Sequence, residues 1–147
     1  MKIAKVRKVK TPTRGTPQSA GLDFYVPDNL SVGCLRVGPG HSAFIPSGIK
    51  VDVPSGHALI AFNKSGVALN KSLLVGACVV DEDYQGEIHL HVMNVGHKEV
   101  EILPGEKLIQ LVLVPVLYEG VQVTDEVDLF TEDSQRGAGG FGSTGIF

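Results

Sequence analysis

The last twelve residues, 136–147, combine residue types that can bind phosphate groups. Five of the first ten are glycine, which favours neither helix nor strand and leaves backbone N–H groups free to surround an anion. Arg136 offers a planar guanidinium, and Ser143 and Thr144 offer hydroxyls. Phe141 offers an aromatic ring that can lie flat on a base. A glycine-rich end can also be a solvated tail, but this combination favours a phosphate-binding flap.

A second group of polar residues, 81–86, lies between two strongly apolar runs and reads Asp-Glu-Asp-Tyr-Gln-Gly. This pattern predicts a hairpin turn, and a turn held by rigid strands is a common place for binding and catalytic groups. His89 and His91 follow it and share one face of a strand, as metal ligands can. With no third ligand in view, polar or subunit-interface roles are favoured for both.

Short apolar runs must position these groups. The runs are rich in Val, Ile and Leu and alternate with Gly, Pro, Asn and Asp, which is typical of an antiparallel sandwich or barrel. One short helix is expected after Ser65, through residues 67–69, with Ser65 as its cap. The expected strands are residues 3–8, 22–25, 42–45, 49–53, 58–62, 73–80, 87–94, 99–102, 107–115 and 121–127.

Length and composition limit the class of protein. A chain of 147 residues fits one domain, and 43% hydrophobic with 20% charged residues is typical of a soluble globular protein. The longest apolar stretch, residues 108–117, is too short to span a bilayer, and the basic start lacks the apolar run of a signal peptide. We expect a cytoplasmic protein, or one inside the host cell if it is viral. We expect a single β domain over residues 1–127 and a C-terminal arm and flap over residues 128–147 that reaches a neighbouring subunit.

The positions of the cysteines and of the charged residues argue against a zinc site, a disulfide and binding to nucleic acid. Cys34 and Cys78 are far apart and lack neighbouring thiols, so both are expected to be reduced and buried rather than part of a zinc site or disulfide. The net charge is −3, yet six of the 13 lysine and arginine residues fall within residues 1–14. A basic arm can bind nucleic acid, but its alternation with Ile3, Val6 and Val9 favours a solvated strand. We expect neither a nucleic-acid nor a membrane partner.

Five segments line up, in order and spacing, with one family: residues 20–24, 63–68, 76–86, 105–111 and 136–145. They resemble the five motifs of the trimeric dUTP diphosphatases (dUTPases), and the third and fifth are highly specific. The resemblance implies an all-β fold, a distorted jelly roll or β-clip barrel of short antiparallel strands with one short helix and a glycine-rich C-terminal flap. It also implies a homotrimer with each site assembled from all three chains. The reaction would be Mg²⁺-dependent hydrolysis of dUTP to dUMP and diphosphate, which limits uracil incorporation into DNA and supplies dUMP for dTTP synthesis.

The resemblance assigns roles within the third motif. Asp81 matches the carboxylate that activates the water attacking the α-phosphate, whereas Asp83 better suits a turn cap. Tyr84 matches the ring that packs against the deoxyribose and excludes a 2′-hydroxyl. Uracil would be read mainly by main-chain groups of this hairpin, at Gly76, Cys78, Val79 and Val80.

The other motifs would handle the phosphates and the metal. Asp23 matches the residue that helps hold the hydrated Mg²⁺ indirectly, through water, while the ion itself would sit on triphosphate oxygens. The expected phosphate and flap contacts are Lys64, Ser65, Gly66, Gln110, Arg136, Phe141, Gly142 and Ser143.

Two departures from the family pattern lie in these motifs, and a third follows the last expected strand. Lys64 stands where arginine is common, and Cys78 stands where glycine is usual beside the uracil. Residues 118–135 are a few residues longer than usual. Two other functions stay open: a dCTP deaminase of the same fold, and a non-catalytic module that binds nucleotides or a regulatory partner. The hairpin at 81–84 and the complete flap favour the hydrolase.

Overall fold

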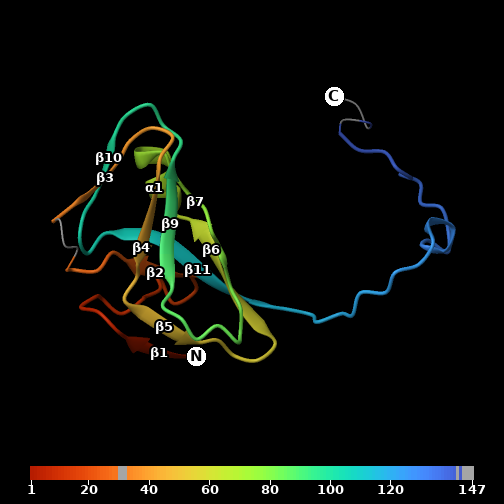
Figure 1. Cartoon of the computed structure of the whole chain (residues 1–147), viewed down its shortest axis with the longest axis horizontal. Helices are drawn as coiled ribbons and strands as arrows, with labels where there is room; N and C mark the ends of the chain where they lie inside the picture. The colour runs from red at the N-terminus through yellow and green to blue at the C-terminus, as the bar shows by residue number, and fades with distance from the viewer. Residues whose placement is uncertain (30–32, 142, 144–147) are drawn as a thin grey trace. The chain divides into compact units, whose positions relative to one another are not determined.

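The computed structural model describes residues 1–29, 33–141 and 143. By compactness the chain divides into two units, Met1–Leu117 and Tyr118–Phe147, and each is described by itself. The strands and helices of the described residues, labelled in Figure 1 where there is room, are β1 Lys2–Lys5, β2 Gly21–Tyr25, β3 Leu35–Val37, β4 Ser42–Pro46, β5 Ile49–Asp52, β6 His57–Asn63, α1 Ser65–Lys71, β7 Leu73–Val75, β8 Val79–Val80, β9 His89–Asn94, β10 Val100–Ile102, β11 Lys107–Pro115 and the 3₁₀ helix η1 Glu126–Asp128.

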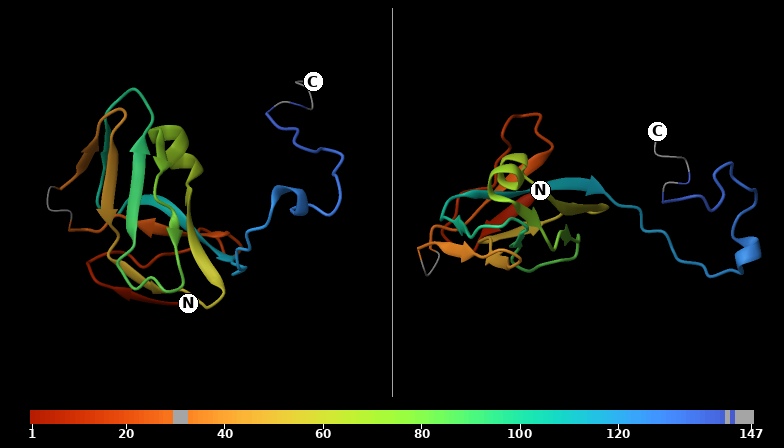
Figure 2. Two further views of the ribbon diagram at one scale, coloured as in Figure 1. Left: turned by 45° about the vertical axis from the view of Figure 1, so that its right-hand side comes forward. Right: turned by 90° about the horizontal axis from the view of Figure 1, so that it is seen from above.

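All strand pairs in the first unit are antiparallel. The larger sheets have the orders β2-β11-β6-β8 and β4-β9-β7, and the pairs β1-β5 and β10-β3 complete the unit. Figures 1 and 2 show β4 and β9 side by side, with β11 crossing them in a second layer. This all-β architecture with one short helix confirms the predicted jelly-roll class.

The core forms where the two larger sheets face each other. Phe24, Leu59 and Leu111 come from the four-stranded sheet, Ile45 and Leu90 come from the three-stranded sheet, and none of these side chains is more than 2% exposed. Because successive side chains of a strand point to opposite faces, strands such as β4, β5 and β9 contribute every second residue to this cluster. The alternating apolar pattern of the sequence is therefore what joins the sheets.

Strand β11 departs from strict alternation at its start. Leu108 and Ile109 are adjacent, yet each is only 1% exposed. The register between β11 and β2 shifts between Lys107 and Ile109, and such a bulge turns two consecutive side chains inward. The shift also sets the direction of the residues after it, which matters for the site described below.

One expected strand is two strands in the structure. The run at residues 73–80 forms β7, which pairs with β9, and β8, which pairs with β6. Residues 76–78 link the two sheets and belong to neither. A continuous strand was wrong here because Gly76 interrupts the apolar run at the point where the chain changes sheets.

Other local expectations are also corrected. Residues 121–127 form no strand, because side chains such as Val121 and Val123 are more than 90% exposed and no partner strand pairs with them in the described part of the chain. The first strand ends at Lys5 rather than at residue 8, and β3 was not expected at all.

The helix and the cysteines differ in detail too. Helix α1 begins at Ser65 itself, its N-cap residue is Lys64, and no side chain caps it. The prediction that Ser65 is the cap was therefore wrong by one position. Both cysteines are free, as expected, but Cys34 is half-buried and Cys78 is exposed, so their predicted burial was wrong.

None of the helices formed by the described residues is long and apolar enough to cross a membrane.

Candidate functional site

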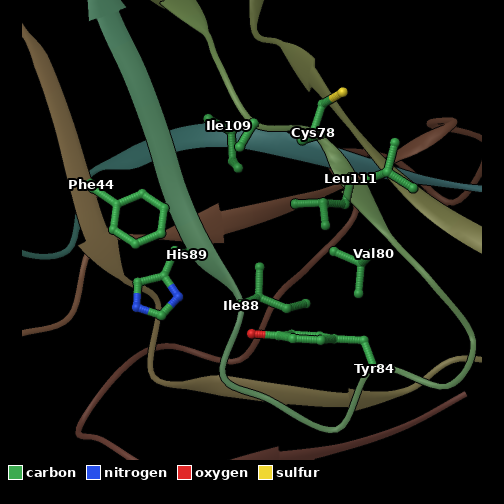
Figure 3. Close-up of a pocket in the computed structure, with 11 residues that line it drawn as sticks. Phe44, Cys78, Val80, Tyr84, Ile88, His89, Ile109 and Leu111 are labelled. Atoms are coloured by element: carbon green, nitrogen blue, oxygen red, sulfur yellow. The ribbon is translucent and has the colours of Figure 1, made fainter.

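A hollow of about 250 Å³ lies beside the link between β7 and β8. We call it the hairpin pocket; side chains that line it are labelled in Figure 3 and include Phe44, Cys78, Val80, Tyr84, His89 and Ile109. Its walls are mostly apolar, and its volume lies just below the usual range for drug-sized ligands. The hairpin pocket therefore suits one small ring.

The segment expected to read a base forms one wall of this pocket. Cys78, Val79 and Val80 line it, and Figure 3 shows Cys78 and Val80 on the same side. Gly76 is next to this wall, where its N–H donates to the carbonyl of His91 at 2.9 Å. The sulfur of Cys78 is drawn pointing away from the other labelled side chains, so a side chain at this position leaves the hollow open.

The ring of Tyr84 closes another side of the hairpin pocket. Figure 3 shows it seen edge-on, across from Ile109. The hydroxyl donates to the carbonyl of Glu87 at 3.0 Å, and the ring occupies the space above Gly86, where a Cβ would lie 2.3 Å from the ring. The glycine and this hydrogen bond together hold the aromatic plane beside the pocket.

Asp81 is the first residue after β8 and is exposed to solvent. Its carbonyl accepts from the N–H of Tyr84 at 3.2 Å, which closes the turn. Asp83 is exposed on the same turn. The turn thus brings a solvated carboxylate and the Tyr84 ring close together along the chain, at one end of the pocket wall.

A second group of predicted residues meets around Asp23, which we call the Asp23 cluster. Lys64 contacts one carboxylate oxygen of Asp23, and Lys107 contacts the other at 3.1 Å. Asp23 is only 5% exposed. Burial alone would raise the pKa of this carboxyl, but the hydrogen bonds and charges of Lys64 and Lys107 outweigh burial and hold the pKa below its ordinary value.

The same contact affects Lys107, whose pKa is raised, chiefly by the hydrogen bond to Asp23. Lys107 belongs to the fourth motif segment, yet we did not predict it as a site residue. Its place in that motif was the available signal. The pairing could not be foreseen because Asp23 and Lys107 are neighbours only across strands β2 and β11.

Gln110 extends the Asp23 cluster along β11. It lies opposite Asp23 in the register of β2 and β11, and its amide donates to the carbonyl of Asn63 at 2.9 Å. A Cβ at Gly21 would lie 2.4 Å from the Gln110 side chain, so the first motif needs glycine for this approach. Ser65 and Gly66 are exposed at the start of α1, next to Lys64 in the chain.

The two groups lie on opposite faces of the four-stranded sheet. Ile109 and Leu111 line the hairpin pocket, and Gln110 between them points the other way because side chains alternate along a strand. Asp23 pairs directly with Gln110 and shares its face. Within one chain, therefore, the expected base wall and the expected phosphate contacts do not face a common space.

The flap residues belong to the second unit. Arg136 donates from Nε to the carbonyl of Gly139 at 2.8 Å, and the N–H of Ser143 donates to the carbonyl of Gly140 at 3.0 Å. Phe141 is fully exposed and has a φ of 49°. Gly142 lies outside the described residues, as do Thr144 and Gly145 of the predicted flap.

Several residues that line the hairpin pocket were not predicted as site residues, and Phe44 and His89 are two of them. Phe44 stacks on His89 with ring centroids 4.3 Å apart and planes within 5°, and both rings line the hairpin pocket. Nothing in the sequence connects β4 with this pocket, because the contact depends on the pairing of β4 with β9. Among the described residues, no group of three or more His, Cys, Asp or Glu side chains is placed to hold a metal ion.

Comparisons with known proteins agree with the predicted motifs. Residues 7–145 match the family described as dUTPase. A deoxyuridine 5′-triphosphate nucleotidohydrolase of Desulfitobacterium hafniense is 35% identical, with 99% of this chain and 96% of the relative covered. The enzyme of the same name from Mus musculus is 34% identical, with 91% and 77% covered.

Solved structures show the same fold at lower identity. The dUTPase of Staphylococcus bacteriophage 80alpha with dUpNHpp has a TM-score of 0.85 at 22% identity, with 99% of this chain and 98% of that chain covered. A mutant dUTPase from phage phi11 of S. aureus, described for its coordination of a structural Mg(II) ion, has a TM-score of 0.74 at 19% identity, with 85% and 96% covered.

Proposed function

This chain belongs to the dUTPase family, and on that premise we propose that it hydrolyses dUTP to dUMP and diphosphate. The observation that carries the proposal is the hairpin pocket, because residues 78–84 supply its main-chain wall and an aromatic ring, and the same segment carries the solvated carboxylate of Asp81. Water attacks the α-phosphorus, the bond to the bridging oxygen breaks, and diphosphate leaves. The reaction removes dUTP from the pool of nucleoside triphosphates, and its product dUMP is available for dTTP synthesis.

The pyrimidine ring occupies the hairpin pocket in this proposal. Main-chain groups of Gly76, Cys78, Val79 and Val80 pair with the edge of uracil, because backbone N–H and C=O groups provide both donors and acceptors. The small volume supports a single ring rather than a whole nucleotide. Apolar walls exclude water from these hydrogen bonds, which makes a mismatched edge costly.

Tyr84 and Asp81 act next to the base. The Tyr84 ring packs against the deoxyribose and leaves no room for a 2′-hydroxyl; its position is supported by the bond to Glu87 and by the space at Gly86. Asp81 orients the attacking water and accepts its proton. Its exposure supports this role, since the carboxylate is open to an incoming water and phosphate.

The phosphates bind to the other predicted residues. Lys64 and Gln110 lie near one another around Asp23, and Ser65 and Gly66 adjoin Lys64 at the start of α1. Lysine is a point charge where arginine would offer a planar fork, so Lys64 leaves more of the phosphate binding to other groups. The flap supplies those groups through Arg136, Phe141, Gly142 and Ser143.

The placement of the two groups supports a site that is shared between chains. The hairpin pocket and the Asp23 cluster lie on opposite faces of β11, so one chain alone does not offer both to a single nucleotide. A complete site requires a second chain that presents the complementary face. We propose three chains, with the arm and flap of residues 128–147 reaching a neighbouring subunit.

Mg²⁺ is the proposed cofactor, because a triphosphate carries more negative charge than Lys64 and Arg136 balance. Both oxygens of Asp23 are paired with lysines, which suits a contact with the metal through water better than direct coordination. When bound to the triphosphate, the ion neutralises charge that develops during attack.

An assay of diphosphate release tests the function directly. We expect rapid release from dUTP with Mg²⁺, far slower release from dTTP, dCTP and UTP, and none when the metal is chelated. Turnover of dCTP with ammonia release would identify a deaminase instead. Tight binding of dUTP without turnover would identify a non-catalytic module.

A further inference from the structure

The link at residues 76–78 lies beside the hairpin pocket but outside every sheet ladder. It joins β7 of the three-stranded sheet to β8 of the four-stranded sheet. Main-chain groups in a ladder are held by the neighbouring strand, whereas groups in a link need other partners. The structure supplies these partners from two sides.

His91 on β9 holds the first half of the link. Its carbonyl accepts from the N–H of Gly76 at 2.9 Å, and its ring atom Nδ1 accepts from the N–H of Ala77 at 2.8 Å. A nitrogen that accepts a hydrogen bond carries no proton, so the neutral His91 ring has its proton on Nε2. The N–H of Ala61 holds the other half, by donating to the carbonyl of Cys78 at 2.7 Å.

One peptide group remains between these two anchors. Among the described residues, neither the carbonyl of Ala77 nor the N–H of Cys78 has a hydrogen-bond partner. The peptide groups on both sides are held, by His91 and by Ala61. The free peptide therefore has a defined orientation at the pocket wall and is available to a ligand.

The His91 ring is itself held in place. Phe44 meets it edge-on, with centroids 5.7 Å apart and an angle of 78° between the planes. Gly76 provides the space for the ring, because a Cβ there would lie 2.3 Å from Nδ1. Gly76 and His91 thus form a complementary pair, with the imidazole occupying the place of a side chain at residue 76.

We propose that His91 is a positioning residue for base recognition: through Nδ1 it holds the Ala77 N–H and thereby orients the free peptide between Ala77 and Cys78 toward the pyrimidine. The proposal rests on the proposed function, in which the base occupies the hairpin pocket. His91 touches neither substrate nor water in this role. Its effect is on substrate affinity and on the choice between uracil and cytosine.

Three substitutions of His91 separate the hydrogen bond from the bulk of the ring. In His91→Asn the oxygen Oδ1 is as many bonds from the backbone as Nδ1, so the acceptor is retained. In His91→Gln the oxygen is one bond further away, and in His91→Leu it is absent. His41→Leu, at an exposed turn between β3 and β4, is the matched control.

We expect His91→Leu and His91→Gln to raise KM for dUTP about tenfold, the equivalent of one hydrogen bond, with kcat unchanged. The ratio of kcat/KM for dUTP over dCTP should fall in both, while His91→Asn and His41→Leu should match the unchanged protein. Equal effects of the Asn and Gln variants, or a fall in kcat with constant KM and base preference, would show that His91 is only structural.

Nitrogen NMR of the imidazole gives a readout that does not depend on activity. The free protein should show His91 with Nδ1 unprotonated and Nε2 protonated, and protonated Nδ1 would overturn the proposal. If the unchanged protein fails to hydrolyse dUTP but shows this tautomer, the proposed function fails while the contact stands. If the unchanged protein hydrolyses dUTP and none of the His91 substitutions alters KM or the preference for dUTP over dCTP, only this inference fails.

Discussion

At the scale of single residues, Asp81 and Asp83 offer a matched test of the proposed base, because both carboxylates are exposed on one turn. Asp81→Asn keeps the shape but removes the proton acceptor, so kcat should fall by at least ~10² while dUTP still binds. Asp83→Asn should change kcat little. The measurement is diphosphate release together with calorimetric binding of dUpNHpp. Near-normal turnover by Asp81→Asn would reject Asp81 as the base.

The Asp23 cluster predicts a pH dependence of stability. The pKa of Asp23 is held below its ordinary value by Lys64 and Lys107, so the carboxylate stabilises the fold above the ordinary carboxyl pKa of about 4. This contribution is lost as the pH falls through the lower pKa of the folded state. Asp23→Asn should therefore cost about 2 kcal/mol at neutral pH and progressively less below about pH 4.

Thermal unfolding across this pH range, at one fixed protein concentration, measures the effect. Asp52→Asn is the control, because Asp52 pairs with Lys2 at the surface, where both side chains are largely exposed and screened by solvent. A constant difference between the unchanged protein and Asp23→Asn at all pH values would contradict the assigned charge state.

At the scale of elements, the turn between β4 and β5 is hydrogen-bonded to Glu87, which follows the Asp81 turn in the chain. Gly48 donates to Glu87 at 2.7 Å, and the same carboxylate pairs with Arg7 at 2.7 Å. Gly48 has a φ of 75°, and a Cβ there would lie 2.9 Å from both Arg7 and Val9. Close packing at this turn therefore requires glycine.

Alanine substitutions at two glycines distinguish the cost of a close contact from the cost of a positive φ. Gly56 has a φ of 73° with open space around it, so Gly56→Ala should lose only the backbone strain of about 1–2 kcal/mol. Gly48→Ala should lose a further ~1–3 kcal/mol from the close contacts. Urea unfolding measures both. Equal losses would mean that Arg7 and Val9 move aside without cost.

The flap is the second element with a test of its own. Deletion of residues 136–147 should lower kcat/KM by ~10² or more, because in the proposed mechanism the donors of this segment act on charge that develops in the transition state. The melting temperature should stay unchanged, since Arg136 and Phe141 contribute nothing to the core described above. A truncated protein that fails to fold would show that the segment is structural, and normal turnover would remove the flap from the mechanism.

Stacking of Phe141 alone is too weak to order the flap, so charged contacts are needed as well. Ordering ten residues costs about 1 kcal/mol or more each, whereas one aromatic stack returns ~1–3 kcal/mol. In the proposed mechanism, contacts from Arg136 and Ser143 to the phosphates supply most of the rest. Phe141→Ala should therefore reduce kcat/KM less than Arg136→Ala does.

At the scale of the whole molecule, the proposed sharing of sites between chains predicts complementation. Asp81→Asn chains and chains lacking residues 136–147 should each be inactive and should regain activity after mixing and subunit exchange. If the carboxylate and the flap come from different chains, about a quarter of the sites are complete by random assortment. Light scattering should report three chains. Absence of recovery, with exchange confirmed by labelled subunits, would place each site within one chain.

The sequence by itself determined the family, the all-β class and the residues that carry the motifs. These depend on local properties: alternation of apolar residues predicts strands, glycine and proline predict turns, and the motifs at 76–86 and 136–145 are read from residue type and spacing. Predictions failed where a partner strand decides the outcome. Residues 121–127 have strand-forming side chains but no neighbour in the described part of the chain, and the run at 73–80 is divided between two sheets.

Only the tertiary structure decided how the predicted residues are grouped. Asp23, Lys64 and Lys107 come together because β2 and β6 both pair with β11. The alternation along β11 turns Gln110 away from the hairpin pocket. The contact of His91 with the Ala77 N–H likewise depends on β9 lying beside the link. Such contacts join positions far apart in the chain, and their geometry is set by strand register, which no local pattern specifies.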